Sequence, residues 1–167
     1  MISPEYCVMM ARYARWQNDS LMEAADGIGD AARRQDRGAF FGSIMQTFSH
    51  LLWGDTMWLS RLGAGDPATG SLAETGTYVT DWQVFRAERA KINARALDWA
   101  EALTQADMAG DYSWYSEAVG RQINVSKATC MVHMFNHGTH HRGQIHAMLT
   151  AAGARPDDTD LPFMPTL

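Results

Sequence analysis

Histidine spacing is the feature of this sequence that most directly predicts chemistry. Five of the six histidines lie between positions 133 and 146. If that stretch is helical, His137 and His141 stand four residues apart on one face, with Cβ atoms about 5–6 Å apart. Two imidazoles at this spacing can share one divalent metal ion, because zinc–nitrogen bonds are about 2.0–2.1 Å long. The pattern therefore predicts a metal centre on this segment.

The same two histidines fall on the apolar face of the predicted helix, counted at about 100° per residue. A buried neutral imidazole needs a hydrogen-bond partner at each nitrogen, so two of them on an apolar face are costly unless something joins them. A bound metal ion would join them. His133 and His140 lie at the edge of this face, and His146 lies on the opposite side, where we expect solvent or a subunit interface.

A third ligand must come from another element or from the same helix. His50 is the only histidine outside the stretch, and it lies at the edge of the apolar stripe of an earlier predicted helix, beside Trp53 and Met57. A residue there can face a pocket between helices, with Trp53 and Met57 as pocket residues. His133 is the alternative, because positions 133, 137 and 141 form an i, i+4, i+8 series.

Several other chemistries are excluded or disfavoured. Residues 137–141 read His-Gly-Thr-His-His, so the glutamate that serves as general base in HExxH zinc peptidases is missing. The net charge of −5 and the lack of a basic run argue against nucleic-acid binding. Cys7 and Cys130 form no CxxC motif, and the sequence shows no signal peptide and no apolar run of membrane-spanning length. We therefore expect a reduced, cytoplasmic protein with no membrane association.

The elements that must position the histidines are four amphipathic helices. Hydrophobic periodicity and end signals place them at about residues 4–25, 38–62, 80–103 and 127–152. Gly27 and Gly29 are expected to end the first helix, and Thr80 with Gln83 has capping-box spacing for the third. A hydrophobic fraction of 46% and a charged fraction of 20% are typical of a globular protein, and residues 1–167 are expected to form a single domain. The predicted fold is an all-α four-helix bundle.

The connections between the helices are long. A short hairpin of Tyr112–Tyr115 and Gln122–Val125 around Gly120 is expected between the third and fourth helices. Because the links on both sides of the third helix are long, either one can cross the bundle, and the topology stays open. Residues 154–167 contain three prolines and are expected to be extended and packed on the surface.

The run Phe135–Gln144, which reads FNHGTHHRGQ, resembles the HxxxHRGQ signature of the DinB/YfiT-like superfamily. Weaker similarities extend the likeness to nearly the whole chain, and the motif in the fourth predicted helix is the specific one. The weaker elements are Trp16-Gln17-Asn18, Phe41-Gly42-Ser43-Ile44 with His50, Asp55 and Trp58-Leu59, Thr80-Asp81-Trp82 with Arg86-Ala87-Glu88-Arg89, and Gly153 with Thr159-Asp160-Leu161.

The resemblance implies a four-helix bundle, commonly a homodimer, that holds a divalent metal ion, often zinc or nickel, with three histidines. Carried over position by position, the ligands are His50, His137 and His141. Similar proteins include thiol-dependent transferases and isomerases and others described only as metal-dependent hydrolases. The implied function is therefore activation of a low-molecular-weight thiol or of water for attack on a small-molecule substrate. The alternatives are a non-catalytic metal- or ligand-binding stress-response protein and a purely structural dimer.

A few polar residues are candidates for supporting roles. Asn18 is expected to point into the bundle mouth and bind a ligand or a metal-bound water, and Gln144 faces inward and is expected to hydrogen-bond near the site. Asp55 is a candidate hydrogen-bond acceptor for a ligand histidine. It lies about 140° around its helix from His50, so a carboxylate on the helix surface is the alternative. Arg142 is a candidate anchor for an anionic substrate, with an exposed helical arginine as the alternative.

Overall fold

The first helix, α1 (Pro4–Arg34), is longer than the sequence predicts. In the computed structural model, which describes residues 2–166, Ser3 caps its start by accepting a hydrogen bond from the Tyr6 amide. Gly29 has non-helical backbone angles, with φ 76° and ψ 168°, so the first long helical stretch ends there and a short second stretch continues to Arg34 across a kink. The buried Arg33 side chain donates to the carbonyl of Ala25 across this kink, at 2.8 Å. The prediction that a glycine ends the first helix is therefore confirmed at Gly29, a few residues after the predicted last residue, Ala25. The short helical stretch beyond the kink was not predicted.

The second helix, α2 (Ile44–Arg61), begins later than predicted. Residues 38–43 form a tight turn instead, in which Ala39 and Gly42 make an isolated β-bridge. Ser43 then caps the helix by accepting from the amide of Gln46 at 3.2 Å. The predicted start at residue 38 is wrong because this capping serine lies five residues further on. The turn matters for the site, since it brings residues 36–42 alongside His50.

The third and fourth helices and the hairpin between them lie close to where the sequence predicts them. α3 (Trp82–Ala102) is capped by Asp81, which accepts from the amide of Val84, so the predicted capping box on Thr80 does not form. β1 (Asp111–Ser116) and β2 (Arg121–Ser126) pair antiparallel, and α4 (Lys127–Ala151) follows directly. Short 3-10 turns occur at η1 (Leu72–Thr77), η2 (Gln105–Met108) and η3 (Leu161–Phe163).

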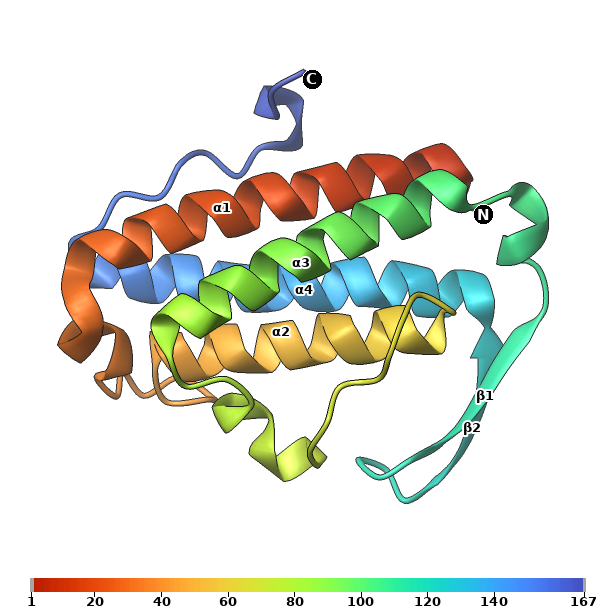
Figure 1. Cartoon of the computed structure of the whole chain (residues 1–167), viewed down its shortest axis with the longest axis horizontal. Helices are drawn as coiled ribbons and strands as arrows, with labels where there is room; N and C mark the ends of the chain where they lie inside the picture. Colours follow the sequence, from red (N-terminus) through yellow and green to blue (C-terminus); the bar gives the residue numbers. More distant parts are fainter. Residues whose placement is uncertain (1, 167) are drawn as a thin grey trace.

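The four helices form a bundle in which α1 and α2 each pack mainly against α3 and α4. Figure 1 shows that α1 and α4 run in one direction and α2 and α3 in the other. The connection from α2 to α3 therefore returns along the length of the bundle, and η1 lies on it and packs against α2. This arrangement settles the topology that the sequence left open and confirms the all-α bundle with an inserted hairpin.

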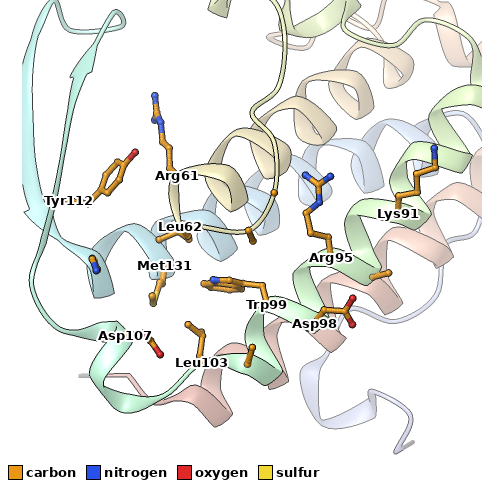
Figure 2. Close-up of a pocket in the computed structure, with 16 residues that line it drawn as sticks. Arg61, Leu62, Lys91, Arg95, Asp98, Trp99, Leu103, Asp107, Tyr112 and Met131 are labelled. Atoms are coloured by element: carbon orange, nitrogen blue, oxygen red, sulfur yellow. The ribbon is translucent and has the colours of Figure 1, made fainter.

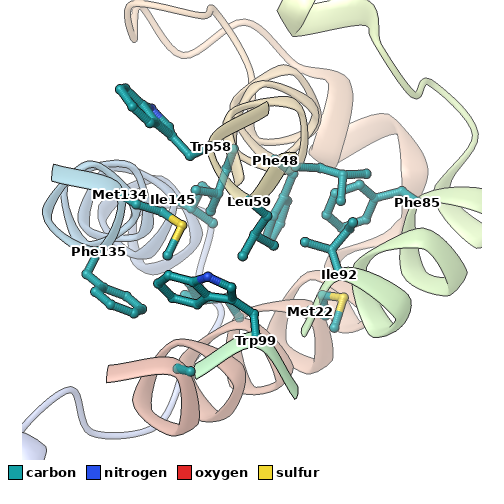
Figure 3. Close-up of a cluster of buried hydrophobic side chains, with 14 of the residues drawn as sticks. Met22, Phe48, Trp58, Leu59, Phe85, Ile92, Trp99, Met134, Phe135 and Ile145 are labelled. Atoms are coloured by element: carbon teal, nitrogen blue, oxygen red, sulfur yellow. The ribbon is translucent and has the colours of Figure 1, made fainter. Parts of the chain in front are cut away.

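Apolar side chains from all four helices fill the bundle (Figure 3). Phe48 of α2 packs its ring against Phe85 and Trp82 of α3, with centroids 5.1 and 5.5 Å apart. Trp99 of α3 contacts Phe135 of α4 across the core. This packing fixes α2 and α4 relative to one another, and those two helices carry the histidines of interest. None of the helices in the described part of the chain is apolar over a length that could cross a membrane.

The segment after α4 runs along the outer face of α1 (Figure 1). The Tyr13 hydroxyl donates to the Thr159 carbonyl at 2.7 Å, and the Gln17 amide donates to the Asp158 carbonyl at 2.9 Å. The amide of Asp157 donates to the Ser20 hydroxyl at 2.8 Å. The predicted surface packing of this segment is thus present, and the 3-10 turn η3 is the one regular element within it.

Candidate metal centre

Three imidazole rings meet between α2 and α4. The Nε2 atom of His137 lies 3.2 Å from Nε2 of His50 and 3.1 Å from Nε2 of His141. His50 and His141 are buried, with 7% and 6% of their surface exposed, and His137 is half-buried. Within residues 2–166 this is the group of side chains whose donor atoms are close enough together to hold one metal ion.

The helix geometry explains how these rings come together. His137 and His141 are one turn apart in α4, so their rings lie on the same face. His50 faces them from α2, which packs against α4. Gly54, one turn after His50, leaves room for the third ring, because a β-carbon there would lie 2.9 Å from Cε1 of His137. A glycine in the middle of α2 thus admits a histidine from α4.

Hydrogen bonds hold two of the rings in one tautomer. The Thr75 hydroxyl donates its proton to the Leu72 carbonyl at 3.2 Å, so it accepts from Nδ1–H of His50 at 2.9 Å. The Gln144 side-chain oxygen accepts from Nδ1–H of His141 at 2.8 Å. In both rings the proton is on Nδ1, and the lone pair of Nε2 therefore points toward the middle of the cluster.

Burial keeps the three imidazoles neutral. Desolvation, with a smaller contribution from the neighbouring His141 and His137, lowers the pKa of His50 to about 3. Desolvation and His141 lower the pKa of His137 to about 4, against a small opposing effect of Asp55. Burial also lowers the pKa of His141, although its hydrogen bond to Gln144 raises it in part. At neutral pH all three rings are in the unprotonated form that metals bind.

The arrangement fits a divalent metal ion. In His50 and His141 the Nε2 atom carries a lone pair and no proton. Only a proton on Nε2 of His137 could then form a hydrogen bond within the cluster, and one proton cannot hold three nitrogens together. The Nδ1 atom of His137 is buried and has no hydrogen-bond partner within residues 2–166. Tetrahedral zinc with bonds of about 2.0–2.1 Å separates its ligand atoms by roughly 3.3–3.4 Å, close to the 3.1 and 3.2 Å found between these nitrogens.

Two residues that the sequence did not single out as site residues complete the centre. Phe41, in the turn before α2, stacks on His50 with ring centroids 4.0 Å apart and meets His141 edge-on at 5.6 Å. Thr75 reaches His50 from η1. No spacing in the sequence indicates Thr75, since it lies 25 residues from its partner in a connection without periodicity. Gly54 was also not predicted as part of the site, although a glycine inside an otherwise regular predicted helix could have indicated a close contact there.

The remaining predicted site residues lie in several places. His133 lies beside the cluster, with its ring 5.6 Å from that of His137 and 5.0 Å from Trp58, and it is outside the group of converging nitrogens. Trp53 donates to the carbonyl of Thr69 and so holds the long connection against α2. Met57 is half-buried and packs against the hydrophobic core.

Two polar candidates point into the bundle core. Asn18 is buried and donates to the side-chain oxygen of Asn93 at 2.8 Å, so it faces α3 instead of the bundle mouth. Asp55 accepts from Arg89 at 2.7 Å in a largely buried ion pair. Within residues 2–166 it has no hydrogen bond to a histidine, and it is not a surface carboxylate either.

Arg142 is also buried, although an exposed position was one of the two expectations for it. It donates to the Thr139 hydroxyl within α4, and burial lowers its pKa to about 10. It is not among the residues that line the cavity beside the histidines, so it is not placed to anchor a substrate there.

Two large cavities open on the surface of the bundle. One, of about 950 Å³, lies between residues 36–46, η1 and α4, and His50, His141 and Gln144 form part of its wall. The other, of about 1060 Å³, lies at the far end of α2 and α3 and is lined by Arg61, Arg95 and Trp99 among others (Figure 2). Of these two cavities, the first is the one lined by members of the cluster, His50 and His141, so a reactant would reach the cluster from there.

Fold and site together define a helical bundle with a three-histidine cluster suited to a metal ion. Residues 1–167 match the model of the DinB family, and the chain belongs to the DinB family. The crystal structure of a DinB-like protein from Bacillus cereus has the same fold, with a TM-score of 0.63 and 17% sequence identity over 86% of this chain and 90% of that chain. No curated protein matches the sequence significantly. The family and fold expected from the histidine motif are thus confirmed.

Proposed function

We propose that this protein is a metal-dependent enzyme that activates a thiol or a water molecule for attack on a small-molecule substrate. The observation that carries the proposal is the convergence of three neutral histidines, two of which, His50 and His141, form part of the wall of an open cavity. His50, His137 and His141 would hold a divalent ion, with zinc or nickel as the expected metals. When bound, such an ion keeps its positive charge, lowers the pKa of a bound water toward about 7 and deprotonates a bound thiol.

The protein's own residues supply orientation and shielding. Thr75 and Gln144 fix the tautomers of His50 and His141, so the lone pairs of Nε2 are already directed before a metal binds. Phe41 covers the His50 ring and limits the access of water from that side. His140, exposed on the cavity wall with its ring 4.8 Å from that of His141, is placed to hydrogen-bond with a substrate.

Elemental analysis of untagged protein purified without chelators tests the metal centre first. We expect about one zinc or nickel per chain in the wild type and little in His50→Ala and His141→Ala. His146→Ala is the matched control, because it removes a histidine from the same helix outside the cluster. Wild-type protein that takes up neither metal after incubation would overturn the proposal.

Catalysis is tested separately on the metal-loaded protein. Low-molecular-weight thiols are combined with electrophilic substrates, and hydrolysis of activated esters and amides is measured in parallel. Turnover that disappears in His141→Ala and persists in His146→Ala would support the enzyme. Metal binding with no turnover over a broad panel would favour the alternative, a non-catalytic metal-binding protein.

A further inference from the structure

The cavity beside the three histidines differs in charge from the rest of the molecule. Among the described residues that line it, Asp36 is the only Asp, Glu, Lys or Arg. The other polar groups on its wall are neutral amides, hydroxyls and imidazoles. The cavity at the far end of the bundle is lined instead by four cations, Arg61, Lys91, Arg95 and Lys127, against two carboxylates (Figure 2). The lack of lysine and arginine on the wall is therefore a local property of the cavity beside the histidines.

Apolar side chains surround the mouth of the same cavity. Phe40 is 86% exposed and Leu72 is 43% exposed, and both line it. The Phe40 ring meets Phe41 at 4.9 Å, and Phe41 in turn stacks on His50. An apolar surface thus leads from solvent to the cluster. Large exposed apolar side chains grouped at a cavity are typical of a binding site.

We propose that the cavity beside His50 and His141 selects reactants with an apolar body that is uncharged or cationic, and disfavours anionic ones. This inference rests on the proposed function, because it assumes a metal ion on the three histidines. A bound thiolate neutralises part of the charge of the ion, so the attraction of the ion for a second negative charge at the far end of the ligand is weakened. The body of the ligand lies along the lining residues of segments 36–42 and 72–77, among which Asp36 carries the formal charge. Arg37 and Glu74 belong to the same segments but are not among the residues that line the cavity, so no lysine or arginine on its wall compensates a carboxylate.

Thiol binding to the cobalt-loaded protein tests the selection without relying on turnover. The probes are phenylmethanethiol, its 4-carboxylate and its 4-aminomethyl derivative, which share one ring and differ in charge. The thiolate-to-cobalt absorption band reports binding, and the visible cobalt bands report metal occupancy independently. We expect the carboxylate to bind roughly fivefold more weakly than the neutral thiol, the size of effect that one charge exerts at about 8 Å in a partly hydrated site.

Two variants and a control sharpen the result. Asp36→Asn keeps the acceptor that receives the amide of Gly38 at 2.9 Å, so the turn is retained while the charge is removed, and the preference should largely disappear. Thr77→Lys adds a cation to the exposed wall and should favour the carboxylate. Asp98→Asn removes a carboxylate from the other cavity and should leave the preference unchanged.

The outcomes separate this inference from the proposed function. The inference would be overturned if the cobalt bands had normal intensity but the three thiols bound equally well, or the carboxylate bound best. The metal centre would then still be supported. An absence of cobalt bands in the wild type would overturn both.

Discussion

Gly54 of α2 and His137 of α4 are in such close contact that no other residue fits between the helices without displacing the ring. A β-carbon on Gly54 would lie 2.9 Å from Cε1 and 3.5 Å from Nδ1 of His137. Real β-carbons almost never approach an atom at the shorter of these distances. The position of the imidazole that contacts both other histidines is therefore set by a missing side chain on the facing helix.

Gly54→Ala should weaken metal binding while preserving the fold. The added methyl group pushes the His137 ring away from the other two nitrogens, and we expect zinc affinity to fall at least about tenfold, as when groups that orient a ligand are altered. Competition with a chromophoric chelator measures the affinity, and circular dichroism checks the helices.

Gly143→Ala is the matched control, since it is a helical glycine of α4 with nothing within 4 Å of the added carbon. Exchange of glycine for alanine inside a helix stabilises it by about 0.5–1 kcal/mol. Zinc affinity in Gly143→Ala should equal that of the wild type. Equal affinity in Gly54→Ala as well would show that the ring is not held where the structure places it.

Gln144 should matter for the metal although it carries no ligand atom. Gln144→Leu removes the acceptor of the His141 Nδ1–H bond, which frees the ring to rotate and to change tautomer. We expect a loss of about 10–100-fold in zinc affinity, measured by the same competition. Gln144→Glu keeps an acceptor at this position and should retain tight binding. A Leu variant with wild-type affinity would exclude an orienting role.

The Asp55–Arg89 pair should be essential to stability. Arg89 is 3% exposed and Asp55 14% exposed in their side chains. Asp55→Ala leaves a buried guanidinium without its counterion, and breaking such a pair costs about 3–5 kcal/mol. Urea unfolding of the metal-free protein gives the free energy directly.

The exposed pair Arg12–Glu101 provides the comparison, with side chains 42% and 50% exposed. Glu101→Ala should cost less than about 1 kcal/mol, because solvent screens the pair. Replacing both Asp55 and Arg89 by apolar residues should recover much of the loss seen in Asp55→Ala. If Asp55→Ala unfolds at the wild-type urea concentration, the pair is not as desolvated as the structure indicates.

The metal-free protein should become less stable in mild acid. The pKa values of His50 and His137 are lowered to about 3 and about 4 in the folded state, against an ordinary value of 6.5. Between these values the unfolded chain binds more protons than the folded one, so stability is complete above about pH 6.5 and declines as the pH falls toward 4. Urea midpoints from pH 7.5 to 4.5 in the presence of a chelator measure this.

His137→Asn should flatten that pH dependence, and His146→Asn should not. A wild-type midpoint that stays constant from pH 7.5 to 4.5 would show that the rings are already hydrated in the folded state.

The sequence predicts the three histidines that the structure brings together, with His133 left open as the alternative to His50. His137 and His141 follow from the period of α4, and His50 from being the single histidine elsewhere in the chain and from its match to the DinB motif. The sequence did not predict the contacts that depend on tertiary packing. Thr75 meets His50 through a connection that crosses the bundle, and Gly54 meets His137 across two helices. Such contacts leave no periodic pattern in either segment.

The helix boundaries, too, were predictable where a local signal sets them and unpredictable where a tertiary contact does. The start of α4 after Ser126 was correct because the capping residue is adjacent to the helix it caps. The glycine break in α1 was correct at Gly29, but the helical stretch beyond it was not predicted, because Arg33 holds that stretch through the Ala25 carbonyl and the Trp82 ring of α3. Asn18 was expected at the bundle mouth because its position in α1 says nothing of Asn93, its partner 75 residues away.

The segment that packs along α1 has a consequence for the order in which the protein can mature during synthesis. Ser20 obtains its partner, the amide of Asp157, only after another 137 residues have been added. The carbonyls of residues 159 and 158, which accept hydrogen bonds from Tyr13 and Gln17, are likewise synthesised long after their donors. Until residues 157–159 have been synthesised, α1 therefore has an outer face without its cover. The outer face of α1 is therefore completed late, after all four helices have been made.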